Sequence, residues 1–389
     1  MLITNILKKF NTFKIESPFE IPTEGYLFLY NTQIYDVSKK TCILFSPEGK
    51  IIENTEIIDK TLPFYVFDGK DYLICPRFIE HHKHGGFVIN FNDCSYDDVI
   101  EFAKKIYTYG VGTFFPTIMT DTLSIINKQI KEITKAIDIT KNFHSNIAKI
   151  GGINLEGPFL SREKAGIHPI ELLLPPTIEN LNKIDLTNIK LITIAPELDK
   201  NFETIKYLNS KNIVVSLGHS SATGDIADAA FQNGATCITH LFNACPPLHH
   251  RINTLTTSAL LNDTFVEVIG DLNHINANML KILFKVKDKD KIILVSDALP
   301  IAHSKKTSIH FANQEIFSSK DCATNKTGTL AGSTLFLPET FKQLNKTINL
   351  SFGNFVKYAI SNPSKLLGLD NKLSRKNICF INKKTYEII

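Results

Sequence analysis

The segment Glu80-His81-His82-Lys83-His84 places five ionisable side chains in succession directly after an apolar run. If the segment ends a β-strand, alternate side chains point the same way, so Glu80, His82 and His84 share one face and His81 and Lys83 the other. Two imidazoles on one face of a strand can bind the same metal ion. Taken alone, the segment is equally well explained as a solvated run of histidines.

Four more residues suited to metal binding or proton transfer each follow a separate apolar run: Glu156 in LEGPFL, His219 in SLGHSSAT, His240 in THLFNA and Asp297 in VSDA. A single such histidine is more often a hydrogen-bonded structural residue than a ligand. In a parallel barrel, however, the carboxyl ends of the strands converge, so residues far apart in sequence become neighbours. The pattern predicts a metal site at the strand ends of a barrel, with Asp297 among the candidate residues. Its predicted metal ligands are Glu156, His219, His240, His82 and His84.

Eight short apolar runs, most of them followed by an amphipathic segment, would position these residues. This alternation is typical of parallel β/α architecture, and eight strands close a barrel, so we expect an α/β fold of the (β/α)8 TIM type. One helix is expected to begin after Ser95 and end at Gly110, and another to span about 123–141. The predicted strands cover residues 72–80, 112–118, 147–156, 191–197, 213–219, 236–242, 265–271 and 291–297.

The two ends of the chain have a different pattern from the barrel region. Residues 24–75 alternate β-type runs with turns, which predicts a small β module over 1–75, and the tail 376–389 is expected to pair back onto it. The catalytic barrel would then occupy 76–375. Within it, residues 301–327 are expected to form a loop or β insertion, followed by helical segments at about 335–346 and 352–367.

Composition and charge exclude several classes of protein. The 43 basic and 39 acidic residues give a net charge of +4 without a long basic block, so no nucleic-acid partner is expected. The seven cysteines form no C-x-x-C pair, which favours a reducing cytoplasm over a disulfide framework. The first residues do not have the order of a signal peptide, and no apolar run reaches the ~18 residues of a membrane span. We therefore expect a cytoplasmic protein with no membrane association.

Several strings resemble the ordered motifs of the N-acetylglucosamine-6-phosphate deacetylase family of the amidohydrolase superfamily. They are PRFIEHHKHGG, LEGPFLSREKAGIHP, IAPE, VVSLGHSSAT, THLFNACPPLHHR, LVSDA and GTLAGS, and they span about residues 73–370. The resemblance implies hydrolysis of the N-acetyl group of N-acetylglucosamine 6-phosphate by a metal-activated water, giving glucosamine 6-phosphate and acetate. It makes Glu156, His219 and His240 the principal ligands and Asp297 the general base and acid. His82 and His84 permit a second ion.

The same resemblance implies a substrate site in a homodimer. His168 in GIHP would orient or polarise the acyl group, and Arg251 would contact the sugar phosphate across a dimer interface. A solvated loop containing His249, His250 and Arg251 is the alternative reading, and Asn243 could simply cap a turn. The implied substrate-binding residues are Ile167, His168, Asn243, Ala244, Arg251, His274 and the loop residues Leu330, Ala331 and Gly332.

The sequence departs from the family pattern at a few positions and leaves several alternatives open. Arg77 stands where the family has glycine, Glu80 replaces aspartate, Leu272 and Asn273 replace a glycine-rich pair, and the tail is short. Alternative functions are another amidohydrolase acting on a cyclic amide or nucleobase, or a non-catalytic derivative that binds a sugar phosphate or a metal. The ligand set accepts one or two ions, zinc first and iron, manganese or cobalt as alternatives. N-acetylgalactosamine 6-phosphate is an alternative substrate.

Overall fold

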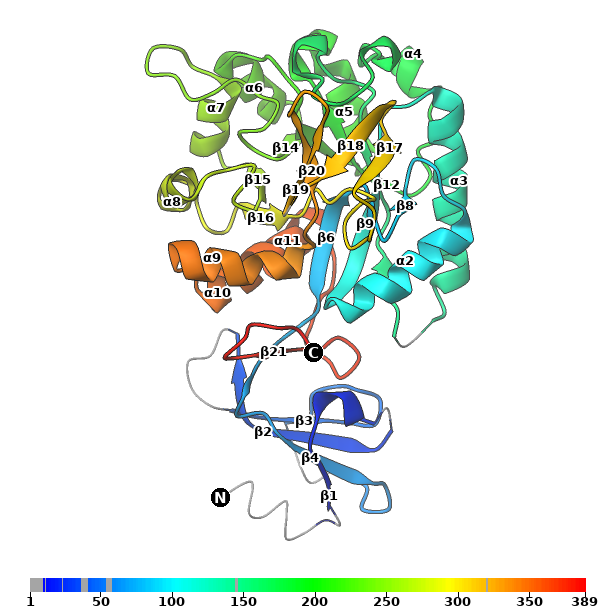
Figure 1. Cartoon of the computed structure of the whole chain (residues 1–389), viewed down its shortest axis with the longest axis vertical. Coiled ribbons are helices and arrows are strands. Elements are labelled where there is room, and N and C mark those ends of the chain that lie inside the picture. Colours follow the sequence, from blue (N-terminus) through cyan, green and yellow to red (C-terminus); the bar gives the residue numbers. More distant parts are fainter. Residues whose placement is uncertain are drawn as a thin grey trace.

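The computed structural model describes residues 10, 12–22, 24–35, 41–53, 58–143, 146–319 and 321–389. At its centre a parallel sheet curves into the predicted (β/α)8 barrel, with strand order β6-β9-β11-β12-β13-β14-β15-β16 and the short β10 beside β9 (Figure 1). The strands are β6 (Phe78–Lys83), β9 (Val111–Met119), β10 (Lys149–Ile150), β11 (Ile153–Glu156), β12 (Ile189–Ile194), β13 (Val214–Leu217), β14 (Ala235–Ile238), β15 (Phe265–Ile269) and β16 (Ile292–Val295).

The barrel closes between its first and last strands, β6 and β16. The N–H of Asp297 donates to the carbonyl of His82 over 3.0 Å, and the N–H of His84 donates to the carbonyl of Ala298 over 2.8 Å. All four residues of β16 are buried, as in a strand with side chains packed on both faces. Closure therefore brings the end of β6 beside Asp297.

Helices cover the outside of the barrel. Ser95 caps α2 (Tyr96–Thr108) through a capping box with Asp98, and one face of α2 is buried, which confirms the helix predicted after Ser95. The helix predicted at 123–141 is α3 (Leu123–Thr140), capped by Thr122. The others are α4 (Ile178–Leu181), α5 (Glu203–Ser210), α6 (Gly224–Gln232), α7 (Leu255–Leu261), α8 (Ala277–Val286), α9 (Thr340–Ile348), α10 (Phe352–Val356), the π-helical η8 (Lys357–Ser361) and α11 (Asn362–Leu367). No helix within the described ranges is long and apolar enough to cross a membrane.

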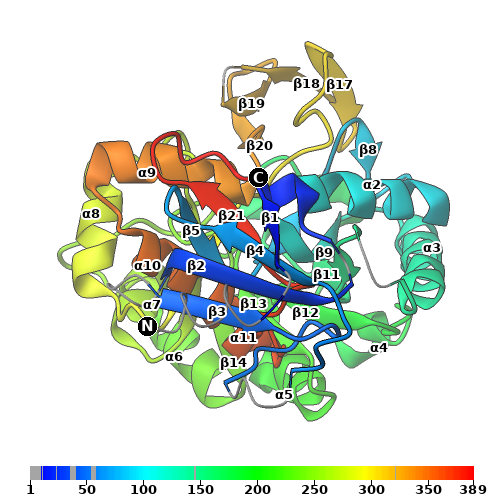
Figure 2. The same ribbon diagram turned by 90° about the horizontal axis from the view of Figure 1, so that it is seen from below.

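A six-stranded sheet lies at the end of the barrel from which β6 starts (Figure 1) and faces the viewer in Figure 2. As expected, the C-terminal strand β21 joins it, pairing antiparallel with β5. The run predicted as one strand at 72–80 is split at Pro76, because β5 belongs to this sheet and β6 to the barrel. A domain border at 75/76 stays a prediction. The strands are β1 (Thr12–Ile15), β2 (Tyr26–Ile34), β3 (Thr41–Phe45), β4 (Phe64–Asp68), β5 (Tyr72–Cys75) and β21 (Cys379–Asn382).

A second, four-stranded antiparallel sheet follows β16 where the sequence predicted a loop or β insertion. Its strands are β17 (Ser308–Phe311), β18 (Gln314–Ser318), β19 (Cys322–Asn325) and β20 (Leu330–Ser333), and we call residues 308–333 the flap. Leu330, Ala331 and Gly332 were expected in a loop, but they form β20 because it pairs with β19. In Figure 1 the flap lies across the front of the barrel, away from the six-stranded sheet.

Candidate active site

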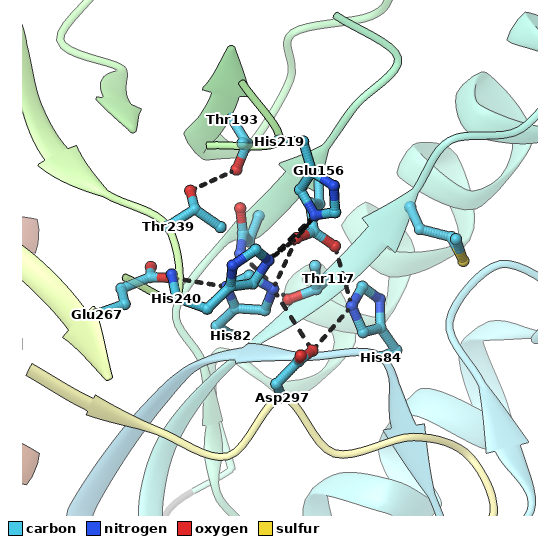
Figure 3. Close-up of polar contacts among 12 residues, drawn as sticks. His82, His84, Thr117, Glu156, Thr193, His219, Thr239, His240, Glu267 and Asp297 are labelled. Carbon is cyan, nitrogen blue, oxygen red and sulfur yellow. Dashed lines mark hydrogen bonds and ion pairs between the residues drawn. The ribbon is translucent and has the colours of Figure 1, made fainter. Parts of the chain in front are cut away.

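The six residues predicted to hold a metal or move a proton converge around the carboxylate of Glu156 (Figure 3). Its Oε1 lies 2.9 Å from Nε2 of His240, 3.2 Å from Nε2 of His219 and 3.4 Å from Nε2 of His82. Its other oxygen, Oε2, lies 3.1 Å from Nε2 of His84. Glu156 therefore presents Oε1 to three imidazoles and Oε2 to the imidazole of His84.

Asp297 closes the cluster from the end of β16. Its Oδ1 lies 3.3 Å from Nε2 of His84 and 3.7 Å from Nε2 of His82. Asp297, His219 and His240 each follow a strand with a positive φ, of 52°, 46° and 28° respectively. Such angles are unfavourable for residues with side chains and concentrate at functional sites. The sharp turns aim all three side chains into the mouth of the barrel.

Hydrogen bonds behind the cluster fix the orientation of two imidazoles. Nδ1 of His82 donates to Oε2 of Glu267 over 2.8 Å, and Nδ1 of His219 donates to the carbonyl of Lys164 over 2.8 Å. Each ring therefore turns its Nε2 towards Glu156 and has its Nδ1 held by an acceptor, which is the arrangement typical of a metal-binding histidine. Nε2 of His82 is buried and has no hydrogen-bond partner among the residues that the structure describes.

Glu267 is a buried residue that the sequence reasoning missed. Its Oε1 accepts from Nε2 of His81 over 2.9 Å, and its Oε2 also receives the N–H of His240 over 3.3 Å. The signal was a glutamate in the middle of the apolar run FVEVIGD, where an unpaired charge would be costly. The register of β6 shifts between Glu80 and Lys83. Simple alternation of its side chains is therefore wrong here, since His81 and His82 reach the same carboxylate.

The chemistry of these donors fits a divalent metal ion. Three groups bring ligand atoms within 4.8 Å of one another. Buried imidazole nitrogens combined with carboxylate oxygens are the ligands of zinc and of the later divalent transition metals. The groups are His82, Glu156 and His240; His82, His84 and Asp297; and Glu156, His168 and His219.

The buried charges shift the pKa values of the site in opposite directions. Burial would lower the pKa of His84, but hydrogen bonds with Asp297 and Glu156 raise it to about 9. Burial raises the pKa of Glu156, yet the imidazoles around it hold that pKa well below the usual value. For His168 burial prevails over the nearby Glu156 and lowers the pKa to about 4. His168 is therefore neutral at neutral pH.

A cavity of about 330 Å³ lies above the cluster. His168 stands at its wall, where its Nδ1 is 2.8 Å from Oγ1 of Thr120 and its Nε2 is 3.5 Å from Oε2 of Glu156. The candidate ligands and proton carrier that line this cavity are His84, Glu156, His219, His240 and Asp297. The predicted substrate-binding residues that line it are Ile167, His168, Asn243, Ala244, His274, Leu330 and Ala331.

Three predicted residues do not line the cavity. His82 is fully buried beneath it. Gly332 is buried behind Asp297, where an added Cβ would come within 2.8 Å of the Asp297 carbonyl oxygen. Arg251 is exposed in the loop after β14, and its backbone N–H bonds to Nδ1 of His249 over 3.2 Å. The structure thus leaves Arg251 apart from the site within one chain.

The structure gives the surroundings of two of the departures from the family pattern. Leu272 adopts a positive φ of 63°. The turn that contains it is held by Asp271, whose Oδ1 accepts from the N–H groups of Asn273 and His274 over 2.9 and 3.0 Å. Oδ2 of Asp271 also accepts from Nδ1 of His274 over 2.7 Å, so His274 keeps a fixed orientation without glycine. Arg77 lies 3.5 Å over the Tyr107 ring, outside the residues that line the cavity.

A (β/α)8 barrel with a buried cluster of histidines and carboxylates at its strand ends defines a TIM-barrel hydrolase of the amidohydrolase type. No family model matches the sequence. The chain is 31% identical over 305 residues to N-acetylglucosamine-6-phosphate deacetylase of Bacillus subtilis (strain 168), and the aligned segment covers 77% of this chain and 76% of that relative. It is 31% identical over 344 residues to the Bos taurus protein of the same name, covering 85% and 81%. The chain belongs to the N-acetylglucosamine-6-phosphate deacetylase family.

A solved structure agrees with this assignment. The N-acetylglucosamine-6-phosphate deacetylase of Thermotoga maritima superposes with a TM-score of 0.79 at 27% identity, and the superposition covers 93% of this chain and 97% of that one. The likeness therefore extends over nearly the whole chain.

Proposed function

We propose that the protein hydrolyses the N-acetyl group of N-acetylglucosamine 6-phosphate, giving glucosamine 6-phosphate and acetate. The observation that carries this proposal is the cluster around Glu156 at the floor of a cavity whose walls come from the family's own motifs. Membership of the deacetylase family supports the same reaction.

A divalent metal ion would be held mainly by Glu156, His219 and His240, and His82 and His84 would provide ligands for a second ion. We infer zinc as the first choice, with iron, manganese or cobalt able to occupy the same nitrogen and oxygen donors. The chemistry supplied by a bound divalent ion is polarisation of the acyl carbonyl and activation of water. Because His82 faces the same oxygen of Glu156 as His219 and His240, these donors would suit one ion or two.

Asp297 is the proton carrier in the proposed reaction. Its carboxylate takes the proton of the attacking water and delivers it to the nitrogen of the departing sugar amine as the carbon–nitrogen bond breaks. Burial would raise its pKa, but hydrogen bonding to His84 and the charge of His82 lower it, which supports an ionised base at neutral pH. His168, neutral and fixed by Thr120, orients the acyl group and supports the developing oxyanion.

The sugar phosphate is bound at the outer end of the cavity in this proposal. Asn243, the Ala244 backbone and His274 contact it, and Leu330 and Ala331 cover it. We infer that Arg251 completes the phosphate site of the neighbouring subunit in a homodimer, because a guanidinium suits a phosphate dianion and Arg251 is exposed in a single chain. The free thiols among the described cysteines support a reducing, cytoplasmic location.

The test is acetate release by protein stripped with a chelator and then reloaded with zinc, iron, manganese or cobalt. We expect release from N-acetylglucosamine 6-phosphate to return with metal and to exceed release from N-acetylgalactosamine 6-phosphate and from the unphosphorylated sugar. Metal-loaded protein that binds the sugar phosphate without turnover would support a non-catalytic derivative. Turnover of a cyclic amide with no acetate release would favour the other amidohydrolase class.

A further inference from the structure

The flap reaches the candidate active site through the end of its first hairpin. Phe311 and Gln314 are paired across β17 and β18, with Ala312 and Asn313 between them at φ of 51° and 60°. Two central residues with positive φ form the tight turn that a two-residue hairpin requires. Directly paired residues project to the same side of a hairpin, so Phe311 and Gln314 both face the barrel.

Phe311 anchors this end of the flap through apolar contacts above the candidate metal ligands. Its side chain is 2% exposed and belongs to a buried cluster with Met119, Ile167 and Leu299. Its ring centroid is 5.9 Å from that of His84. The hairpin is therefore packed against the floor of the cavity, and its position is fixed relative to the candidate ligands.

Gln314 makes a directed polar contact beside this apolar anchor. Its Nε2 donates to the carbonyl of Ile167 over 3.1 Å, and its Oε1 accepts from Nδ2 of Asn325 over 3.0 Å. Asn325 is itself fixed, because its Oδ1 accepts the N–H groups of Thr327 and Thr329, each over 3.0 Å. The carboxamide of Gln314 is thus oriented at both ends and cannot turn over without losing both hydrogen bonds.

The carbonyl that Gln314 holds belongs to the peptide bond that leads into His168. On the other side of that bond, the N–H of His168 donates to the carbonyl of Ala165 over 3.0 Å, and the ring is fixed by Thr120. The position of the ring nitrogen that faces Glu156, at 3.5 Å, therefore depends on three hydrogen bonds, one of which comes from the flap.

We propose that Gln314 is a positioning residue, which holds the Ile167–His168 peptide over the metal cluster and thereby sets where the acyl carbonyl lies during hydrolysis. The inference rests on the proposed function, since it gives His168 the acyl group to orient. The flap then does more than cover the cavity. Asn325 supports Gln314 from the next strand of the flap, and Thr329, which Asn325 also binds, precedes the cavity-lining Leu330.

Two variants of similar length remove the contact in different ways. Gln314→Met removes the donor and the acceptor without adding charge, whereas Gln314→Glu removes only the donor and keeps an acceptor for Asn325. Each should lower kcat for N-acetylglucosamine 6-phosphate by roughly 10-fold to 100-fold, the scale of a small misplacement of a catalytic group. KM should change by no more than about 2-fold, because the sugar and phosphate contacts remain.

Inhibition by glucosamine 6-phosphate separates positioning from general damage. This product has no acyl group, so its inhibition constant should stay within about 2-fold of the wild-type value in both Gln314 variants. Metal content and melting temperature, measured on the same preparations, should also be unchanged.

Two further variants serve as a graded test and a control. Asn325→Asp keeps the acceptor for Thr327 and Thr329 but loses the donor to Gln314, and should lower kcat by only about 3-fold because Gln314 can still donate to Ile167. Glu315→Gln alters the neighbouring residue, which pairs with Lys326 at 3.0 Å, and should leave kcat unchanged.

Wild-type kcat in both Gln314 variants would overturn the proposal. A fall in kcat accompanied by loss of metal, a lower melting temperature or weaker product inhibition would also overturn it, because Gln314 would then be a structural residue. If the wild-type protein itself released no acetate from any of the sugar phosphates, the proposed function would fail first and the role of Gln314 with it.

Discussion

The floor and the outer rim of the cavity are built in different ways. At the floor, His82 and Glu156 are almost completely buried, and His82 is held from behind by Glu267, itself fully buried. At the rim, Arg251 is exposed, and its guanidinium makes no hydrogen bond within the described part of the chain. The neighbouring His249 and His250 stack only on each other, with ring centroids 4.8 Å apart.

The described part of a single chain provides the contacts of the cavity floor, but it provides no hydrogen-bond partner for the guanidinium of Arg251 at the rim. A buried carboxylate surrounded by oriented imidazoles needs no rearrangement to bind a metal, so the chemistry at the floor is preorganised. Ordering an exposed arginine side chain costs conformational entropy. That cost is best offset when a second surface brings an anion with which the guanidinium forms charge-assisted hydrogen bonds. We infer that the reaction depends on residues of one subunit, whereas phosphate affinity depends on two.

The largest expected effect comes from removing the proton carrier at the floor. Asp297→Asn should slow turnover by roughly 10² to 10⁴, the usual contribution of general acid and base catalysis, because an amide cannot take the proton of water. Metal should remain bound, since Glu156, His219 and His240 are intact. Single-turnover acetate release, metal stoichiometry and sugar-phosphate binding on the same preparation would check both parts.

The outcome that would contradict this assignment is near-normal turnover by Asp297→Asn with metal bound. Loss of the metal along with activity would instead make Asp297 mainly a ligand. In that case the floor would have no proton carrier among the residues assigned here.

A smaller effect is expected from the support behind the floor. Glu267→Gln removes one of the two acceptors that hold His81 and His82, and should weaken metal affinity by roughly 10-fold to 100-fold, as is usual when the partner of a ligating histidine is lost. Metal-buffer titration would measure it. Glu80→Gln is the matched control, because Glu80 is as fully buried as Glu267 and lies beside His81 in β6, but accepts from the N–H of Ser296. Equal metal affinity in both variants would remove Glu267 from its supporting role.

The fold and the convergence of the candidate ligands could be predicted from the sequence, because each barrel strand is a short buried run and each candidate ligand follows such a run directly. His219, for instance, comes two residues after the end of β13. Parallel topology then dictates that the strand ends meet, which needs no knowledge of side-chain contacts.

Other features depended on tertiary contacts that the local pattern does not contain. Glu267 was hidden within an apolar strand, since a partner that justifies its burial lies 185 residues away at His82. The family resemblance implied a loop at Leu330–Gly332, whereas pairing with β19 makes this segment the strand β20. Gln314 gave no signal, since its target is a backbone carbonyl.

The smallest effect is expected at the rim. Arg251→Ala should raise KM for the phosphorylated sugar by a factor of ~10, corresponding to loss of a charge-assisted contact of about 1.5 kcal/mol, with little change for the unphosphorylated sugar. His250→Ala is the control, because His250 stacks on His249 in the same loop and has no assigned contact with phosphate. An equal rise in KM for both sugars would show that Arg251 is not the phosphate anchor.

Mixing two inactive or weakened variants tests whether Arg251 acts across a dimer interface. The Asp297→Asn subunit cannot turn over but carries an intact Arg251, whereas the Arg251→Ala subunit keeps its own floor. If subunits assort at random, about half of the Arg251→Ala subunits pair with an Asp297→Asn partner. Those subunits should recover wild-type KM, so the mixture should hydrolyse low concentrations of substrate faster than the two preparations measured separately. Rates that merely add after reassortment would mean that Arg251 serves its own chain or none.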